Sequence, residues 1–596
     1  MSNYKAPLAD MRFVMFDVLK LDAQYARIEG GENATRDTVD AILDEAARFT
    51  EQVLAPLNAI GDEQGCVLDK ATATVTTPPG FKEAYAKYIE GGWSGLTAPE
   101  KYGGQHLPES IGAPIKEMLD SANLSWGNFP LLSHGASEAL RLHGEEWQRE
   151  VFLKHIVDGT WTGTMCLTEP HCGSDVGLLK SRVEANPDGS YRVSGTKIFI
   201  TAGEHDLTEN IVHLVLARLP DAPPGVKGIS LFIVPKYKVD KSGKVGERNA
   251  VTCGAIEHKM GIKASVTCVM NFDGAEGFLI GQPNKGLMAM FTMMNTARLA
   301  VGIQGLGLTE RAYQGALAYA RDRLQGRSLS GAKFPDKPAD PLIVHPDIRR
   351  MLLTQKALAE GGRVLGYYAA SLVDLVERAP DPAERKRADD LLSFIIPITK
   401  ALLTENANEC TYHAVQIFGG HGYIHESGME QFARDARITT IYEGTTGIQA
   451  LDLLGRKTLQ TQGLGLKLFL EEISAFCHAQ AKEPALAEFI APLAIAAKDW
   501  ADLTQEIGKR VLGNPDEVGV AAVDYLFYSG YVALAYFWAR SVAAADASAQ
   551  SVEFKQAKRG TARFYFARIL PRTLTHAAAL RANADTLMMM PAEQFG

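Results

Sequence analysis

The spacing of hydrophobic residues changes from a helical period to alternation and back again, and this change limits the folds that the chain can adopt. Between residues 180 and 272, apolar and polar residues alternate, as they do in strands with one buried face. Asn186-Pro187-Asp188-Gly189 separates the first two runs and indicates a hairpin. Helical spacing dominates on both sides. The sequence therefore predicts a β unit, a sandwich or a barrel, between helical units.

Long helices are predicted before and after the β unit. A chain of 596 residues is too long for one core, so three or four units are expected. Apolar residues recur at helical spacing over 39–57, where Asp37 or Thr38 would cap the helix. Further helices are predicted at residues 288–324, 345–379, 386–418, 487–511, 520–545 and 553–584. The last three lie in an alanine-rich part that suggests packing or subunit contacts rather than chemistry.

Composition and charge argue against several classes of function. The net charge of −9 and the lack of a basic block in the sequence argue against nucleic-acid and anionic-membrane partners. The seven scattered cysteines indicate reduced cytosolic thiols rather than a disulfide framework. We see no signal peptide and no membrane-length apolar run, so a cytoplasmic protein without a transmembrane segment is expected. His421 and His425 lie beside glycines, which favours a loop over a metal site.

Residues 441–447, with the sequence IYEGTTG, carry the most informative chemistry. The lone carboxylate of Glu443 can take a proton from a weak carbon acid. The bare backbone of Gly444 lets a ligand come close, and Thr445 and Thr446 can hydrogen-bond a phosphate or a polar cofactor edge. A Glu-Gly-Thr step is also an ordinary turn, so the segment gains weight only beside other segments that fit the same interpretation.

A loop and a strand earlier in the chain would suit a flat, polar ligand. Residues 166–175 (CLTEPHCGSD) place Thr168 and Ser174 on a loop shaped by proline and glycine, although a capped turn before a strand explains this pattern as well. Phe199 and Thr201 are two apart on a predicted strand and therefore face the same side, which suits a heteroaromatic ring. A core phenylalanine beside a solvent threonine is an equal alternative.

Cationic and glycine-rich positions on the later helices point to a phosphate-bearing ligand. Arg298 and Arg323 lie in the apolar stretch 288–324, where a cation usually needs an anion. A buried carboxylate, or exposure of Arg323 at a helix C-terminus, would also explain them. Residues 416–422 (QIFGGHG) end a helix in a glycine nest that can approach a dinucleotide, but they lack the strand-turn-helix context of a Rossmann site.

In this order and spacing, the segments resemble the signatures of the acyl-CoA dehydrogenase family. The motifs that carry the resemblance are Thr168-Glu169-Pro170 with Gly173-Ser174-Asp175, Gln416 with Gly419-Gly420-His421-Gly422, Arg434-Asp435, and Tyr442-Glu443-Gly444-Thr445. The resemblance runs from residue 40 to residue 456. The chain length and the helical tail resemble a larger bacterial subgroup that includes enzymes named for 3-(methylthio)propionyl-CoA.

The resemblance implies an α+β fold with a helical N-terminal domain, a central β-barrel or sandwich domain, a C-terminal four-helix-bundle domain and an extra C-terminal helical domain. The expected bounds are 1–36 for an N-terminal arm and 37–162, 163–284, 285–456 and 457–596 for the four domains. The resemblance also implies a tightly bound FAD, an acyl-CoA substrate, an electron-transfer flavoprotein as electron acceptor and at least a homodimer.

The resemblance also assigns roles to single residues. Those that would line the flavin are Met165, Leu167, Thr168, Gly173, Ser174, Phe199, Ile200 and Thr201, with Thr445 and Thr446 beside the base. Those that would reach the FAD of a neighbouring subunit are Arg323, Gln416, Gly419 and Gly420. Those that would contact the acyl-CoA are Ser174, Asn295, Arg298 and Gly444.

The sequence departs from the family pattern at several of these positions. Phe199 stands where the family often has Trp, and Asn295 where it often has Asp. Pro346 and Gly447 replace residues with amide side chains, which weakens the FAD contacts expected there. Some members carry their base at the position of Ala297, which cannot act as a base, so the assignment of the base to Glu443 is favoured.

The implied reaction is α,β-dehydrogenation of a saturated acyl-CoA to a trans-2-enoyl-CoA, as in fatty-acid β-oxidation and lipid metabolism. Glu443 would be the base, and the hydride would pass to flavin N5. Gly127 and Leu131 leave room in the implied acyl tunnel, which favours medium or long chains. The alternatives are an acyl-CoA oxidase on the same fold, a 3-(methylthio)propionyl-CoA dehydrogenase, a non-catalytic FAD-bound relative, and chance turns in a purely structural protein.

Overall fold

The computed structural model describes residues 4–596, and the chain divides into two compact units. The helical unit comprises Met1–Ala47, Pro108–Ser121 and Val301–Gly596, and the sheet unit comprises Arg48–Leu107 and Ala122–Ala300. The first part of helix α6 (Glu109–His143) lies in the helical unit and the rest in the sheet unit. Helix α9 (Gly286–Asp322) begins in the sheet unit and ends in the helical unit. Each unit is described by itself.

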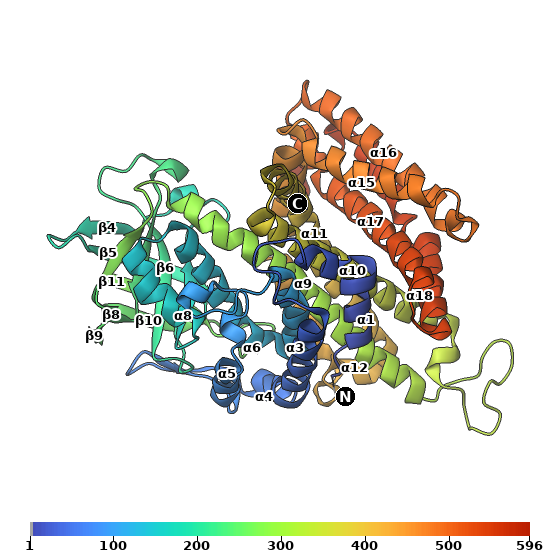
Figure 1. Ribbon diagram of the computed structural model, residues 1–596, viewed down its shortest axis with the longest axis horizontal. Coiled ribbons are helices and arrows are strands. Elements are labelled where there is room, and N and C mark those ends of the chain that lie inside the picture. The colour runs from blue at the N-terminus through green and yellow to red at the C-terminus, as the bar shows by residue number, and fades with distance from the viewer. Residues whose placement is uncertain (1–3) are drawn as a thin grey trace. The chain divides into compact units, whose positions relative to one another are not determined.

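A seven-stranded mixed sheet forms the centre of the sheet unit, with the strand order β3-β6-β7-β11-β5-β4 and with β10 beside β11 (Figure 1). The strands are β3 (Trp161–Cys166), β4 (Arg182–Ala185), β5 (Tyr191–Thr201), β6 (Asn210–Ala217), β7 (Ser230–Pro235), β10 (Val251–Ile256) and β11 (Thr267–Ile280). Only β3 and β6 pair in parallel among these strands. Strand β11 pairs with β5 and β10 along its first part and with β7 at its end, and two bulges in its pairing with β5 accommodate this change.

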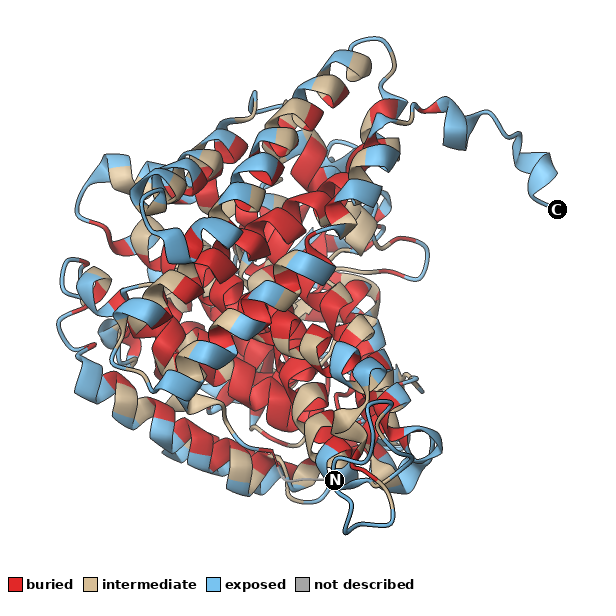
Figure 2. Ribbon diagram, turned by 90° about the vertical axis from the view of Figure 1, so that its right-hand side faces the viewer, coloured by how far each residue is buried: buried red, intermediate tan, exposed pale blue. Residues whose placement is uncertain are grey.

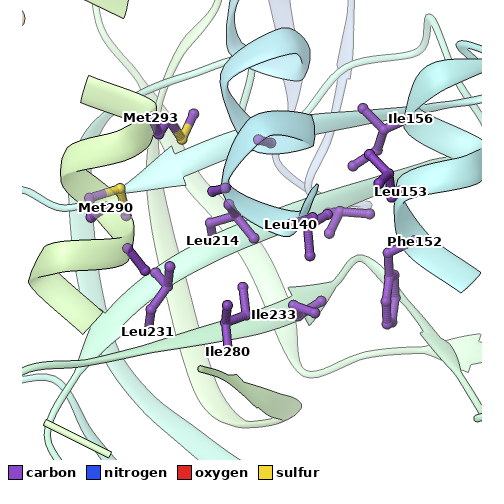
Figure 3. Close-up of a cluster of buried hydrophobic side chains, with 14 of the residues drawn as sticks. Leu140, Phe152, Leu153, Ile156, Leu214, Leu231, Ile233, Ile280, Met290 and Met293 are labelled. Carbon is purple, nitrogen blue, oxygen red and sulfur yellow. The ribbon is translucent and has the colours of Figure 1, made fainter. Parts of the chain in front are cut away.

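One hydrophobic cluster joins the sheet to the helices that cover it. Leu140 on α6 and Met290 on α9 pack with residues of β6, β7 and β11 such as Leu214, Leu231 and Ile280 (Figure 3). Every residue of β6 and β7 is buried, which explains their continuous apolar runs. Burial of each such side chain contributes about 1.5–3 kcal/mol, so this cluster is a main source of stability in the unit. The smaller elements of the unit are α4 (Leu57–Gln64), β1 (Val67–Asp69), β2 (Thr74–Thr76), α5 (Phe81–Glu90), α7 (Glu146–Gln148), α8 (Lys154–Val157), β8 (Tyr237–Val239) and β9 (Val245–Arg248).

Two long neighbouring helices, α10 (Pro346–Arg378) and α11 (Pro382–Phe418), organise the helical unit. Each begins with proline at its first position, where the missing N–H costs nothing, and Asp381 caps α11 through Ala383 N–H. Helix α17 (Asp516–Ala547) packs against both and is buried over most of its length. Figure 2 shows buried residues gathered in the interior, with exposed residues on the outer helix faces. The other helices are α1 (Leu8–Arg12), α2 (Leu21–Tyr25), α3 (Arg36–Phe49), α12 (Gly420–Tyr423), α13 (Met429–Arg437), α14 (Thr446–Leu451), α15 (Leu464–Gln480), α16 (Ala487–Val511), α18 (Val552–Phe564), α19 (Arg572–Arg581) and α20 (Asp585–Met588).

A network of buried charges connects distant parts of the helical unit. The guanidinium of Arg363 on α10 pairs with Glu117 on α6 at 2.6 Å, with Glu310 on α9 at 2.8 Å, and with Asp10 on α1. Lys558 on α18 also pairs with Asp10. Arg363 is fully buried, so these carboxylates supply the negative charge that its burial requires.

The helices and the central mixed sheet confirm the expected α+β class, whereas several boundaries differ from the sequence predictions. Helix α3 begins at Arg36, so Asp37 and Thr38 lie inside it, and Thr35 accepts the N–H of Thr38 at 3.2 Å. The helix predicted over 553–584 is two helices, α18 and α19, separated by a segment that ends at Pro571. Proline lacks the N–H that a continuous helix needs, and here it precedes the first residue of α19. The sequence analysis did not identify β3 or α15, and the five-part division stays a prediction.

The expectation that no apolar run reaches membrane length is wrong by length and composition. Helices α9 and α17 are both long and apolar enough to cross a membrane. Their most apolar windows are 50% and 67% buried within the protein, as in the core helices of a soluble protein. Packing inside the protein therefore explains their composition.

The ion pair between Glu409 on α11 and Arg572 on α19 should make the stability of the helical unit depend on pH. Burial would raise the pKa of Glu409, but hydrogen bonds from Arg572 and His413 lower the pKa to about 2. The folded pKa lies below the ordinary value of 4.5, so the pair stabilises the fold above pH 4.5 and is lost as the pH falls towards 2.

We expect Glu409→Gln to lower the free energy of unfolding by about 1–3 kcal/mol at pH 7, because a charge-assisted bond is weakened. The deficit should shrink as the pH falls below 4.5. Urea unfolding from pH 3 to pH 7 would measure this, with the exposed Glu483→Gln as control. A deficit that stays constant over this range would contradict the assignment.

Candidate functional site

The backbone around Glu443 has an unusual conformation. Glu443 has φ of 56° and Gly444 has φ of 95°, so two successive residues lie in the left-handed region. A left-handed conformation at a residue other than glycine costs about 1–3 kcal/mol and persists only where its surroundings hold it. Thr445 then caps α14, because its hydroxyl accepts the N–H of Ile448. The glutamate of the sequence motif is therefore presented on a strained turn immediately before a helix.

Buried side chains from three helices hold this turn. Lys400 Nζ on α11 donates to the carbonyl of Gly444 at 2.8 Å. Gln449 Nε2 on α14 donates to the carbonyls of Glu443 and Gly444, at 3.1 and 3.3 Å. The hydroxyl of Tyr442 donates to Gln304 Oε1 on α9 at 2.5 Å, and burial raises the pKa of Tyr442 well above its ordinary value. Lys400, Gln449 and Gln304 are all buried. The backbone on both sides of the glutamate is thus fixed.

The two threonines of the motif have different environments. Thr445 is exposed and uses its hydroxyl as a helix cap. The hydroxyl of Thr446 donates to Glu405 Oε1 on α11 at 2.5 Å, so it is already engaged within the protein. The hydroxyl of Thr445 can still donate to a cofactor, whereas the oxygen of Thr446 can still accept a hydrogen bond.

Aromatic stacking in the helical unit brings together a second set of predicted site residues. The rings of Tyr319 on α9 and Phe418 on α11 stack at 4.1 Å between centroids, one helical turn before Arg323 and directly before Gly419. Arg323, Gln416, Gly419 and Gly420 are all exposed. A Cβ atom added at either glycine would meet nothing within 4 Å. The structure therefore offers open backbone beside a cation, as the binding of a phosphate-bearing ligand requires.

In the sheet unit, a buried ion pair shapes the loop that follows β3. The carboxylate of Glu169 accepts bonds from Lys197 Nζ at 2.8 Å and from the N–H groups of Lys180 and Ser181 at 2.7 and 3.0 Å. Burial would raise the pKa of Glu169, but Lys197 and these bonds lower it to about 2. Lys197 Nζ also donates to the carbonyl of Leu167. The loop that carries Thr168, Gly173 and Ser174 is thus anchored at its base.

Phe199 departs from regular strand geometry. Its φ is 58°, and the pairing of β11 with β5 has a bulge between Cys268 and Met270 at this level. The two-residue spacing of Phe199 and Thr201 therefore does not by itself place both side chains on one face. Phe199 is 60% exposed, whereas Ile200 is buried. An exposed aromatic ring on a strained backbone is a feature of a ligand-binding surface.

The remaining predicted residues of the sheet unit lie near the ends of β3 and along α9. Met165 and Leu167 are partly buried, and Ser174 is exposed. Asn295 and Arg298 are three apart on α9 and therefore share a face, where Asn295 is exposed and Arg298 is buried. The predicted site residues thus form two sets, one in each unit.

The sequence analysis missed the residues that hold these sets in place. Lys400, Gln449 and Gln304 support the turn at Glu443, and Lys197 supports the loop at Thr168. Lys197 lies two residues before Phe199 on the same predicted strand, and its position in an apolar run was the available signal. Lys400 likewise stands in the apolar run of α11 with no carboxylate at helical spacing.

Four family models match the chain in order. They are the acyl-CoA dehydrogenase N-terminal domain at residues 36–160, the middle domain at 164–275, the C-terminal domain at 284–458, and the "acetyl-CoA dehydrogenase C-terminal like" model at 469–591. The chain belongs to the acyl-CoA dehydrogenase family. The resemblance noted in the sequence is thereby confirmed, and the protein is an enzyme of this family.

The enzyme is similar to characterised relatives along its whole length. It is 42% identical to 3-methylmercaptopropionyl-CoA dehydrogenase of Ruegeria pomeroyi over 593 residues, which cover 98% of this chain and 99% of the relative. It is 34% identical to a butyryl-CoA dehydrogenase of Syntrophomonas wolfei, with 100% and 99% covered. The crystal structure of an acyl-CoA dehydrogenase complexed with FAD from Bacillus anthracis has the same fold, with a TM-score of 0.74, 21% identity, and 97% and 93% covered.

The left-handed turn predicts that alanine is tolerated differently at two nearby glycines. A Cβ atom at Gly444, where φ is 95°, would lie 2.6 Å from Gln449 Nε2. We expect Gly444→Ala to cost about 1–3 kcal/mol of stability and to lower dehydrogenase turnover, because the turn must rearrange. Gly447→Ala is the matched control, since its Cβ would come no closer than 3.9 Å to Thr445 Oγ1. Thermal unfolding and turnover of both variants would test this, and equal effects would contradict it.

Proposed function

We propose that this enzyme catalyses the FAD-dependent α,β-dehydrogenation of a saturated acyl-CoA thioester, with Glu443 as the catalytic base. The observation that carries the proposal is the strained turn at Glu443. Its carboxylate is half-buried, and donors from Lys400 and Gln449 hold the carbonyls that follow it. A fold maintains such strain where a function requires that conformation. Family membership along the whole chain supports the same conclusion.

The residues present fit an FAD. Phe199 offers an exposed ring face for an isoalloxazine, and the loop with Thr168, Gly173 and Ser174 offers hydroxyl and N–H groups to its polar edge. Gly419 and Gly420 offer the open backbone that a dinucleotide can approach. The exposed Arg323 would meet a phosphate, and we propose that this FAD belongs to a neighbouring subunit of a homodimer. When bound, the flavin would accept the β-hydrogen of the substrate as hydride.

The residues of this chain would remove the α-hydrogen of the substrate as a proton. The Oε atoms of Glu443 would remove the α-proton, while negative charge develops on the thioester oxygen. A hydrogen bond from the Glu443 N–H would stabilise this charge, because a fixed donor needs no reorganisation during the reaction. We propose that Ser174, Asn295, Arg298 and Gly444 contact the acyl-CoA. The exposed Asn295 would make a neutral contact, and Arg298 would supply a positive charge.

The acyl group is the least constrained part of the proposal. The names of the relatives favour short thioesters, because one acts on 3-methylmercaptopropionyl-CoA and another on butyryl-CoA. The sequence argument from Gly127 and Leu131 favoured medium or long chains and stays a prediction. We propose a short thioester, with 3-(methylthio)propionyl-CoA as the first candidate, and an electron-transfer flavoprotein as electron acceptor. Oxygen consumption during turnover would distinguish an oxidase.

Removal of the proposed base should abolish the chemical step. We expect Glu443→Gln to retain FAD and acyl-CoA binding but to reduce the flavin about 10²–10⁴-fold more slowly, the usual scale for a positioned base. The matched control is Glu405→Gln, which changes the carboxylate that accepts from Thr446 and should cost far less. Anaerobic stopped-flow absorbance would measure both rates. Near-normal reduction in Glu443→Gln would place the base elsewhere.

The substrate proposal predicts the order of reactivity in a panel of thioesters. We expect kcat/KM to be highest for 3-(methylthio)propionyl-CoA and butyryl-CoA and to fall with chain length from C8 to C18. Steady-state assays with an artificial electron acceptor would measure this order. A maximum at C8 or longer would favour the sequence argument and exclude the short-chain proposal.

A further inference from the structure

A buried ammonium group contacts the turn that carries the proposed base. Lys400 lies 44 residues before Gly444 in the sequence, and its Nζ donates to the Gly444 carbonyl at 2.8 Å. The side chain is 0% exposed. A buried lysine is uncommon because its ammonium loses hydration, so its contact with this carbonyl needs a reason. The proposed proton transfer does not itself use Lys400.

The contact fixes the geometry of Glu443 through the following residue. The carbonyls of Glu443 and Gly444 belong to the two peptide groups that flank the Cα atom of Gly444. Lys400 and Gln449 hold both carbonyls, at distances from 2.8 to 3.3 Å. Peptide groups are planar, so this clamp sets both dihedral angles of Gly444 and the orientation of the peptide group that follows Glu443. On the other side, the bond from Tyr442 to Gln304 fixes the preceding residue.

The helix that carries Lys400 packs tightly against a neighbouring helix. Helix α9 approaches α11 closely at Gly302 and Gly305, where added Cβ atoms would lie 3.2 Å from the Thr399 carbonyl and 2.5 Å from the Leu403 carbonyl. These contacts lie on both sides of Lys400 in the sequence. Tight backbone packing therefore determines where the ammonium group sits, and the turn must adapt to it.

We propose that Lys400 is a positioning residue that acts through Glu443. Its charge-assisted bond to the Gly444 carbonyl keeps Glu443 in the left-handed conformation, so that its carboxylate and its N–H meet the same substrate. Without this bond, the turn relaxes towards ordinary dihedral angles and the carboxylate moves. A displacement of about 1 Å in such a site costs about 10²-fold in rate. The inference rests on the proposed role of Glu443 as the base.

The test compares Lys400→Met, which removes the donor, with Lys400→Arg, which retains a charged donor. We expect Lys400→Met to lower kcat about 10- to 100-fold with little change in the KM of butyryl-CoA. The kinetic isotope effect with α-deuterated butyryl-CoA should rise, because proton removal becomes rate-limiting. Lys400→Arg should recover part of the rate. In a Glu443→Gln background, Lys400→Met should cause no further loss, because it acts through the residue already removed.

The outcomes separate this inference from the proposed function. Normal flavin reduction in Glu443→Gln refutes the proposed base, whatever Lys400→Met does. Normal kcat in Lys400→Met, with Glu443→Gln inactive, refutes the positioning role alone. An added loss in the double variant also refutes it. If the Lys400 variants lose FAD or unfold, Gln449→Leu removes the other donor without changing a buried charge, and an unchanged kcat there refutes the clamp.

Discussion

A fully buried guanidinium balanced by three carboxylates determines the arrangement of the helical unit. Arg363 draws Asp10, Glu117 and Glu310 from three other helices to one point. Removal of one partner from such a group leaves an uncompensated buried charge, at a cost of about 3–5 kcal/mol. The helix that supplies Glu310 also supplies Gln304, which holds Tyr442 beside the proposed base. One helix, α9, thus joins the buried charge cluster to the turn that carries the proposed base.

In both units, a buried lysine holds a segment that is proposed to meet a ligand. In the sheet unit, buried Lys197 donates to the Leu167 carbonyl and pairs with Glu169. In the helical unit, buried Lys400 donates to the Gly444 carbonyl. Each ammonium group lies on a regular element and holds an irregular segment by its backbone. The loop that follows β3 and the left-handed turn at Glu443 are thereby held by a rigid strand and a rigid helix.

The sequence revealed the residues that are proposed to meet a ligand more readily than the residues that hold them. Glu443 and Phe199 stand in short motifs with recognisable chemistry, and the long helices followed from hydrophobic spacing. The clamp by Lys400 is a contact between residues 44 apart in the sequence. No carboxylate at helical spacing from Lys400 indicates such a contact in the sequence. The break before α19 was missed because apolar residues continue through Pro571 at helical spacing. Hydrophobic spacing thus predicted most of the long helices, whereas the contacts that hold the proposed site arise from long-range packing that the local sequence does not show.

The pairing of Lys558 with Asp10 has a consequence for how the protein is made. These residues are 548 apart, and α17, which packs against both α10 and α11, is also among the last segments of the chain. During synthesis, α10 and α11 emerge from the ribosome long before α17 and Lys558 can cover and neutralise them. Asp10 can pair with Arg363 once α10 is made, but its second cation, Lys558, and the apolar cover from α17 arrive only near the end of translation. Apolar surface that is exposed over this interval makes a nascent chain prone to aggregate.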